Sequence, residues 1–478
     1  MAHNFNEIKK VMAKKKILLL SDDLRMSSGI ANMSKQLVMG SLQQYDWVQL
    51  GAAVKHPEEG TILDLCDDVR GKTGIEDAYL KIYPSTGYGT AEKLREVLAI
   101  EKPDAILHFT DPRYWIWLYD IEHEIRQHTP IFFYHIWDDL PDPKYNRDYY
   151  ESCDWIGCIS KQTFGITNRV WSLTSKDRWK QPQPWQVSYV PHGINTVDYK
   201  VTDVPADFKK KIFGDKTYDF VLYWSNRNIR RKQPIEVIYA FKEFVAKLTP
   251  EQAKKTVLLM HTQPVDDNGT DLPKVIADNA PEINVIFDTG RWNESELNYL
   301  YNIADVTINI ASNEGFGLAT AESIMAGTPI IVNVTGGMQD QCGFLFSNEE
   351  VHGNWDYTRP SDYVKWGSLH DWRLWKDTLK WGDWVTPVWS TSRSFTGSVP
   401  TPYIFEDHID YVEVADSIRY WYDMGREQRK EKGLLGRDFA LGVGGLSVQN
   451  MCQTLINGMD GAFENWKPRK KYELFKIK

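Results

Sequence analysis

The stretch Ser312-Asn-Glu-Gly-Phe-Gly-Leu-Ala-Thr-Ala-Glu-Ser-Ile-Met-Ala-Gly-Thr-Pro329 decides the fold of this chain. An apolar run at 306–310 precedes it and another at 329–332 follows, so we expect two strands joined by a helix that begins at about Leu318. Two glycines, at 315 and 317, permit a tight turn just ahead of that helix. Because free amides and the dipole at a helix start favour a phosphate, the stretch predicts a phosphate-binding turn in an α/β protein.

Two glutamates, Glu314 and Glu322, stand on either side of this turn with seven residues between them. The first lies in the loop ahead of the helix, and the second lies just over one turn into it. This spacing places two hydrogen-bond acceptors beside a bound phosphate, as a sugar on one side and a ribose on the other would require. Glutamates at this spacing are common in helices, so the specificity comes from the whole string and its flanking strands.

Alternating strands and helices extend from this stretch in both directions. We expect further strands at 17–20, 47–50, 105–109, 131–135, 155–159, 187–190, 220–223, 256–261 and 284–287. A proline, several lysines and a glycine interrupt the alternation between residues 201 and 215. The pattern therefore predicts two doubly wound units, each with a parallel sheet.

A basic segment, Arg227-Asn-Ile-Arg-Arg-Lys232, follows the first strand of the second half. Fixed cations stabilise a leaving diphosphate most strongly in the transition state, where its negative charge grows. Arginine offers a planar fork for this task and lysine a point charge, so Arg227, Arg230, Arg231 and Lys232 compete for the role. A solvated basic turn is the alternative interpretation.

Together these motifs resemble the retaining GT-B glycosyltransferases, in particular the group-1 family that includes glycogen-synthase-like enzymes. Glu314 and Glu322 fall on the Glu-x7-Glu element of that family. The resemblance implies that Glu314 binds hydroxyls of the transferred sugar and that Glu322 binds the ribose hydroxyls of the donor. It also implies that the amides of Phe316, Gly317 and Leu318 face the sugar and the diphosphate.

Two further elements of the family have counterparts here. Arg227 and Lys232 match its Gly-Arg-x4-Lys-Gly element, which grips the donor diphosphate, although Asn226 and Gln233 stand where the family has glycine. Gly29 matches a glycine-rich loop that the family places after its first strand, near the donor phosphates. The resemblance therefore implies donor-binding roles for Arg227, Lys232 and Gly29.

Two histidines are candidates by the same resemblance, and a third, His192, marks the domain boundary. His135 ends a predicted strand at the place where many family members carry a histidine near the reactive face of the sugar. His108 ends another strand and is its rival, and a structural role is the alternative for either. His192 replaces the usual asparagine of the segment that leads into the linker between the domains.

The fold and function that the resemblance implies are those of a GT-B enzyme, with two facing Rossmann-like domains and a cleft between them. We expect an acceptor-side domain at 1–200 and a nucleotide-sugar-binding domain at 201–440, with a Trp-rich insertion at 341–402. Residues 441–478 would form a helix that crosses back to the first domain, and a basic tail. The implied activity is retaining transfer of a sugar from a nucleotide-diphosphate sugar to a hydroxyl acceptor.

No metal and no cofactor are expected beyond the nucleotide-sugar donor itself. Asp138, Asp139 and Asp142 lie close together in Trp-Asp-Asp-Leu-Pro-Asp-Pro, and a GT-A enzyme would use an Asp-x-Asp pair to hold a divalent ion. The fold resembled here does that work with cationic side chains and a helix terminus. We therefore interpret these aspartates as loop or acceptor-side residues, and the activity as metal-independent.

The identity of the acceptor stays open. A net charge of −9 favours a glycan or a small hydroxylated molecule over a polyanion. The basic tail Lys467-Pro-Arg-Lys-Lys471 leaves a hydroxylated base in DNA as an alternative. A catalytically inactive sugar-nucleotide sensor or scaffold is a third possibility, but it has no need of both Glu314 and His135. Seven tryptophans within 341–402 (residues 355, 366, 372, 375, 381, 384 and 389) predict either a small aromatic core or an acceptor platform.

The cysteine content and the hydropathy of the chain indicate in which cellular compartment the protein is found. The five cysteines are odd in number and include no Cys-x-x-Cys pair, which is typical of a reducing cytoplasm. No apolar run approaches the roughly 20 residues that a membrane-spanning helix needs. We therefore expect a cytoplasmic protein without a transmembrane segment.

Overall fold

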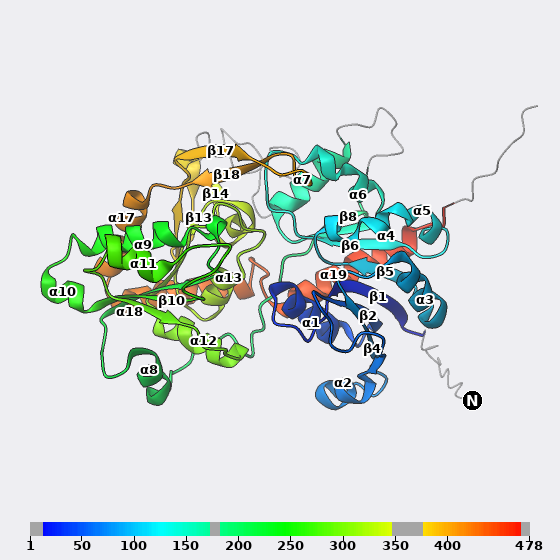
Figure 1. Cartoon of the computed structure of the whole chain (residues 1–478), viewed down its shortest axis with the longest axis horizontal. Coiled ribbons are helices and arrows are strands. Elements are labelled where there is room, and N and C mark those ends of the chain that lie inside the picture. Colours follow the sequence, from blue (N-terminus) through cyan, green and yellow to red (C-terminus); the bar gives the residue numbers. More distant parts are fainter. Residues whose placement is uncertain (1–12, 173–181, 347–375, 470–478) are drawn as a thin grey trace, which may run out of the picture. The chain divides into compact units, whose positions relative to one another are not determined.

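The structure is a computed structural model that describes residues 13–172, 182–346 and 376–469 (Figure 1). Its contacts divide the chain into two compact units. Unit 1 comprises Met1–Phe133, Ser152–Asp154 and Trp466–Lys478, and unit 2 comprises Tyr134–Glu151 and Trp155–Asn465. The limits expected from the sequence, 1–200 and 201–440, stay a prediction.

Unit 1 is built on strands with the order β3-β4-β2-β1-β5-β6. Strand β1 pairs in parallel with β2 and β5, and β2 pairs in parallel with β4. The side chains at 17–20 in β1 are fully buried, which explains why this strand is a short apolar run in the sequence. The strands are β1 (Lys15–Asp22), β2 (Tyr45–Ala53), β3 (Leu63–Asp64), β4 (Leu80–Thr86), β5 (Ala105–His108) and β6 (Ile131–His135). The helices of unit 1 are α1 (Gly29–Ser41), α2 (Cys66–Thr73), α3 (Ala91–Glu101), α4 (Ile116–Asp120) and α5 (Glu122–Ile125).

Strand β4 is one that the sequence pattern did not predict. It contains Pro84, which pairs in register with Gly51 of β2. A proline has no N–H to donate to a ladder, so its presence argues against a strand. The strand forms nonetheless, near the edge of the sheet, where only the two-residue β3 lies beyond it.

Unit 2 contains a six-stranded sheet with the order β11-β10-β9-β12-β13-β16, and all of its neighbouring strands pair in parallel. Its strands are β9 (Phe220–Ser225), β10 (Thr256–His261), β11 (Val285–Asp288), β12 (Val306–Asn309), β13 (Ile330–Asn333) and β16 (Val385–Val388). Two further strands of this unit, β7 (Trp155–Cys158) and β8 (Val187–Tyr189), pair in parallel. The helices up to α13 are α6 (Arg147–Glu151), α7 (Lys161–Ser172), α8 (Ala206–Phe213), α9 (Pro234–Val245), α10 (Pro250–Lys254), α11 (Leu272–Asn279), α12 (Glu294–Ile303) and α13 (Leu318–Met325).

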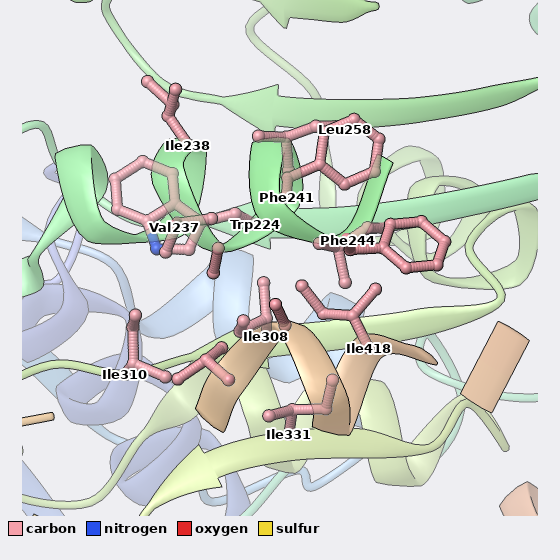
Figure 2. Close-up of a cluster of buried hydrophobic side chains, with 14 of the residues drawn as sticks. Trp224, Val237, Ile238, Phe241, Phe244, Leu258, Ile308, Ile310, Ile331 and Ile418 are labelled. Atoms are coloured by element: carbon pink, nitrogen blue, oxygen red, sulfur yellow. The ribbon is translucent and has the colours of Figure 1, made fainter. Parts of the chain in front are cut away.

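The core of the six-stranded sheet explains the apolar runs of the second half. Figure 2 shows Phe241 and Phe244 of α9 packing with side chains of strands β10, β12 and β13. Ile418, from α17 (Tyr411–Asp423), joins the same cluster. Each buried side chain of this size contributes about 1.5–3 kcal/mol to the free energy of folding. The cluster therefore stabilises the sheet whose strand ends carry the candidate site.

The segment 341–402, expected to be an insertion, contributes one strand to the sheet. Strand β16 pairs with β13 and includes Pro387, which the edge position tolerates. After it, β17 (Ser392–Thr396) and β18 (Ile404–His408) form an antiparallel hairpin. A two-stranded ribbon joins β14 (Leu345–Phe346) to β15 (Leu379–Lys380).

Three of the seven tryptophans of this segment lie in the described residues. Trp384 and Trp389 are buried, and Trp384 stacks on Phe439 with ring centroids 4.6 Å apart. Trp381 is 43% exposed. The other four, at 355, 366, 372 and 375, lie outside the described residues, so the choice between an aromatic core and an acceptor platform stays open for them.

Helices α18 (Arg426–Leu441) and α19 (Val448–Asn465) close unit 2. Helix α19 contacts β7 and β8, and Gly458 makes room for the ring of Trp155. Helix α18 was not predicted, because its buried face consists of Arg429, Gly433, Gly436 and Ala440 and so presents no stripe of large apolar residues. Of the helices in the described ranges, none combines the length and the apolar character needed to cross a bilayer.

All five cysteines are free and buried. Burial raises the pKa of each thiol that faces the interior, as at Cys153, Cys158 and Cys342. These thiols therefore behave as small apolar side chains rather than as nucleophiles.

Candidate active site

The predicted turn lies at the carboxyl end of β12, within unit 2. Gly317 has φ +86°, a conformation that favours glycine, and it directly precedes α13. A Cβ there would lie 2.8 Å from both Met338 Cγ and Thr320 Oγ1. No side chain caps α13, so the amides of its first turn are available to an anion.

Glu314 forms an ion pair with Lys232 beside this turn. Lys232 ends the 3-10 turn η4 (Arg230–Lys232), which precedes α9, and it is 7% exposed. Burial alone would raise the pKa of the Glu314 carboxyl, but the positive charges of Lys232 and Arg231 outweigh burial and hold this pKa below its ordinary value. Burial lowers the pKa of the Lys232 ammonium, and Glu314 opposes that effect. The structure thus joins the two motifs of the sequence in one charged cluster.

Arg231 is the second cation of this cluster. Its Nη1 donates to the carbonyl oxygen of Asn313 at 2.8 Å, and Nη1 lies 4.0 Å from Asp138 Oδ2. Arg231 was only a competitor in the sequence. It stands one residue before Lys232, and nothing in the sequence distinguished it from Arg227 or Arg230.

Arg227 takes no part in these contacts. Its Nε forms an ion pair with Asp266 Oδ2 at 3.0 Å. The Arg227 side chain is 63% exposed. Arg230 is also exposed and pairs with Glu406 at 2.8 Å. Of the basic segment, the structure therefore brings Arg231 and Lys232 to Glu314.

Glu322 lies one turn into α13 and is surrounded by tyrosines. The hydroxyl of Tyr301 donates to Glu322 Oε2 at 2.6 Å, and Tyr199 lies near the same carboxyl. Burial raises the pKa of Glu322 to about 7, and the two tyrosines oppose the rise only in part. No local pattern pointed to these tyrosines, because Tyr199 and Tyr301 lie about 100 positions apart along the chain.

An acidic loop approaches the turn within the same unit. A Cβ on Gly315 would lie 3.2 Å from the carbonyl oxygen of Ile136 and 3.9 Å from Asp138 Cβ. Asn313 donates one amide hydrogen to the carboxylate of Asp139 and another to the carbonyl oxygen of Phe405, in β18. Burial raises the pKa of Asp139 well above its ordinary value, and the charge of Asp138 adds to the rise. This loop and the β17–β18 hairpin therefore hold the residue that precedes Glu314.

The candidate histidines are buried and hydrogen-bonded. His135 is 1% exposed; its Nδ1 lies 3.0 Å from Thr167 Oγ1 and its Nε2 lies 3.3 Å from the hydroxyl of Tyr150. In unit 1, His108 contacts Tyr119 and Thr110 through its two ring nitrogens, and burial lowers its pKa to about 3. The structure thus shows both histidines with structural partners.

His192 is the histidine that lies against the turn. Its ring centroid is 5.2 Å from that of Phe316, and its Nδ1 lies 2.9 Å from the hydroxyl of Tyr134. Burial lowers the pKa of His192 to about 3, so the ring is neutral. The sequence marked it only as the start of a linker.

Gly29 opens helix α1 in unit 1. Ser28 caps that helix by accepting from the amide of Ala31 at 3.0 Å, and its hydroxyl donates to Asp22 Oδ2 at 2.7 Å. The donor-binding role expected for Gly29 stays a prediction.

Within the described residues, no group of three or more His, Cys, Asp or Glu side chains is arranged to hold a metal ion. Asp138 and Asp139 are adjacent, but the atoms near them are the amide of Asn313 and the guanidinium of Arg231. The predicted independence from metals stays a prediction.

Comparison with solved structures defines the fold. A glycosyltransferase from Rickettsia africae superposes with a TM-score of 0.59 at 13% identity, over 95% of this chain and 100% of that one. Anabaena HepE, in complex with UDP and glucose, superposes with a TM-score of 0.58 at 12% identity, over 93% of this chain and 99% of that one. The fold predicted from the sequence is confirmed: the chain is an α/β protein with the GT-B fold.

The family follows from the sequence of unit 2. Residues 206–347, which carry the turn, both glutamates and the basic segment, match the model of the group 1 glycosyl transferases. This segment of the chain is therefore similar to that family. An uncharacterized glycosyltransferase of Methanocaldococcus jannaschii is 26% identical over 205 residues, which make up 39% of this chain. The match spans about half of that relative, 51% of its length.

Proposed function

We propose that this protein is a retaining glycosyltransferase that moves a sugar from a nucleotide-diphosphate sugar to a hydroxyl acceptor. One observation carries the proposal: Glu314 and Lys232 form a largely buried ion pair beside an uncapped helix start, and Arg231, whose side chain is 44% exposed, adds a second positive charge there. A structural ion pair needs only one cation and no free amides. A diphosphate bearing a sugar needs two cations, free amides and a carboxylate for the sugar hydroxyls.

The roles of the residues follow from their places. The amides of Phe316, Gly317 and Leu318 and the cations Lys232 and Arg231 would receive the diphosphate. The carboxylate of Glu314, which its neighbours keep ionised, would accept hydrogen bonds from sugar hydroxyls. Glu322 would accept from the ribose hydroxyls in place of Tyr301 and Tyr199. The complex of HepE with UDP and glucose is consistent with a uridine donor, although that ligand belongs to HepE.

The proposed reaction is a same-face displacement. The bond between the anomeric carbon and the leaving phosphate oxygen breaks first, and positive charge develops on the sugar. The acceptor oxygen then forms its bond to the anomeric carbon on the same face, and its proton passes to the departing diphosphate. Lys232 and Arg231 stabilise the charge that gathers on that diphosphate. No protein nucleophile is required, and the configuration is retained.

Two roles expected from the sequence need a rearrangement. His135 can contact the sugar only if it gives up its hydrogen bond to Thr167 or to Tyr150. Arg227 can contact the diphosphate only if it leaves Asp266. The variants His135→Gln and Arg227→Met therefore test these roles separately from the cluster.

The test measures release of nucleoside diphosphate from UDP-, GDP-, ADP- and dTDP-sugars by the purified protein. We expect slow hydrolysis of one donor, with a rate about 100-fold lower in Glu314→Gln and in Lys232→Met. Arg230→Met is the matched control, because Arg230 is 79% exposed, and it should retain the wild-type rate. The double variant Glu314→Gln/Lys232→Met, which leaves no unpaired buried charge, shows whether a loss in Lys232→Met comes from misfolding.

Other outcomes decide between the alternatives. A donor that binds with no diphosphate release, with or without hydroxylated acceptors, would indicate the inactive sensor. Absence of binding to every donor would refute the proposal. Inversion of the anomeric configuration in the product, measured by NMR, would refute the retaining assignment alone.

A further inference from the structure

Unit 1 carries a cluster of aromatic and acidic side chains at the carboxyl ends of three parallel strands. Asp22 ends β1, Tyr88 follows β4, and Asp111 and Tyr114 follow β5. In open α/β sheets, ligands bind at this end of the strands. We refer to Asp22, Tyr88, Asp111 and Tyr114 as the tyrosine platform.

The two tyrosines stack on each other and stand on a buried indole. The ring centroids of Tyr88 and Tyr114 are 4.9 Å apart with an interplanar angle of 12°. Trp115 is fully buried and supports Tyr88, at 5.5 Å between centroids and 64°. Tyr114 is 59% exposed. An exposed aromatic ring held in place by a buried one is a surface on which the apolar face of a sugar ring can stack.

Polar groups around the platform lack partners. Asp22 Oδ2 accepts from Ser28, but within the described residues Asp22 Oδ1 and the hydroxyls of Tyr88 and Tyr114 have no hydrogen-bond partner. The indole N–H of Trp117 is buried without a partner as well, and its ring lies 3.6 Å from a Cβ placed on Gly89. Buried donors without partners are rare in folded proteins, so this one indicates a ligand or water that accepts from it.

The charge of the tyrosine platform determines which ligands it can bind. Burial raises the pKa of Tyr88, and the negative charges of Asp22 and Asp111 add to the rise. Arg113 pairs with Asp111 at 2.6 Å. Arg25 is held by Asp23 and by a glutamate, so no cation pairs with Asp22 among the described residues. The uncompensated charge is therefore negative, and it repels a phosphate.

We propose that the tyrosine platform binds a neutral sugar ring of the acceptor, which stacks on Tyr114 and donates its hydroxyls to Asp22. This proposal rests on the proposed transferase function and narrows its substrate class. Phosphorylated sugars, phospholipid headgroups and DNA are excluded by the same argument, because each would bring phosphate to Asp22.

The test first measures binding without any donor, by saturation-transfer NMR on the full-length protein. The probes are neutral tetrasaccharides of the glucan, mannan, galactan and chitin types, with glucose 6-phosphate and DNA containing hydroxymethylated bases as charged probes. We expect at least one neutral tetrasaccharide to bind, and its affinity to fall about tenfold in Tyr114→Ala. Ile116→Ala is the matched control, because Ile116 is 51% exposed on the neighbouring helix and lies outside the stack, and it should bind as the wild type does.

A second variant separates stacking from charge. Asp22→Asn should weaken neutral-sugar binding and at the same time reduce the discrimination against glucose 6-phosphate. Failure of every neutral probe to bind, an equal loss in Ile116→Ala, or tight binding of a charged probe by the wild type would each overturn the proposal. Donor hydrolysis is assayed in the wild type and in Ile116→Ala, which should hydrolyse the donor at the same rate. Absence of donor hydrolysis from the wild type would refute the transferase function, whereas failure of the wild type to bind any neutral probe, with donor hydrolysis intact, would refute only the platform.

Discussion

Glu322→Gln is the substitution whose effect on stability the structure defines most sharply. Burial raises the pKa of Glu322 from 4.5 to about 7. A carboxyl group with a raised folded-state pKa binds its proton more tightly in the folded protein than in the unfolded chain. Its contribution to stability is therefore complete below pH 4.5, is lost as the pH rises toward about 7, and changes little above that.

The size of the effect follows from the same two values. A rise from 4.5 to about 7 corresponds to about 3 kcal/mol in the free energy of unfolding between the ends of that pH range. A glutamine cannot ionise, so Glu322→Gln should remove this dependence. The variant should match the wild type near pH 4.5 and be more stable by about 3 kcal/mol at pH 8.

The assay is denaturant unfolding of ligand-free wild type and Glu322→Gln from pH 4.5 to pH 8, followed by tryptophan fluorescence. Glu282→Gln is the matched control, because Glu282 is an exposed glutamate of the same unit. The control should leave the pH dependence unchanged. Donor affinity should move in the opposite direction, because ribose hydroxyls need the ionised carboxylate as acceptor, so the wild type should bind its donor more tightly above pH 7.

Parallel stability curves for the wild type and Glu322→Gln over this pH range would refute the reasoning. Such a result would mean that Glu322 is ionised throughout, as an exposed glutamate is. Loss of donor binding in the variant without the stability gain would support the ribose role but contradict the electrostatic account of it.

Three further predictions concern neighbouring features. Tyr301→Phe removes a hydrogen bond that lowers the pKa of Glu322, so the midpoint of the pH profile for donor binding should move upward, measured by titration calorimetry at several pH values. Gly336→Ala places a Cβ against the backbone of Glu314 at φ +52°, so donor affinity should fall at least about tenfold while the circular dichroism spectrum stays unchanged. Arg429→Ala leaves its buried carboxylate partner, 2.8 Å away, without a cation, and chemical denaturation should show a loss of about 3–5 kcal/mol.

Local patterns predicted the fold well because its strands are short apolar runs between polar loops. The run at 256–261 coincides with β10, and the run at 131–135 coincides with β6. Strands β4 and β16 were missed because each contains a proline, and a proline is tolerated only where the final position of the strand in the sheet permits it. The position of a strand in a sheet is a long-range property that no local window contains.

Some residues of the candidate site could likewise be predicted from local sequence, and others could not. The turn and Glu314 follow from one continuous stretch, and Lys232 follows from a second, so both could be read from the sequence. The choice of Arg231 as the second cation could not, because side-chain direction decides it: Arg227 points to Asp266, whereas Arg231 reaches Asn313. The tyrosines around Glu322 come from separate segments and meet only in the folded chain.

The burial of all five cysteines makes the native protein a convenient subject for site-specific labelling. Thiol reagents need an accessible thiolate, and burial denies them both access and ionisation at these positions. A cysteine introduced at the exposed Val54 and another at the exposed Val265 would then be the reactive pair, with no native cysteine to remove first. Fluorophores at those two positions, one in each unit, would report how the distance between the units changes when a nucleotide sugar is added.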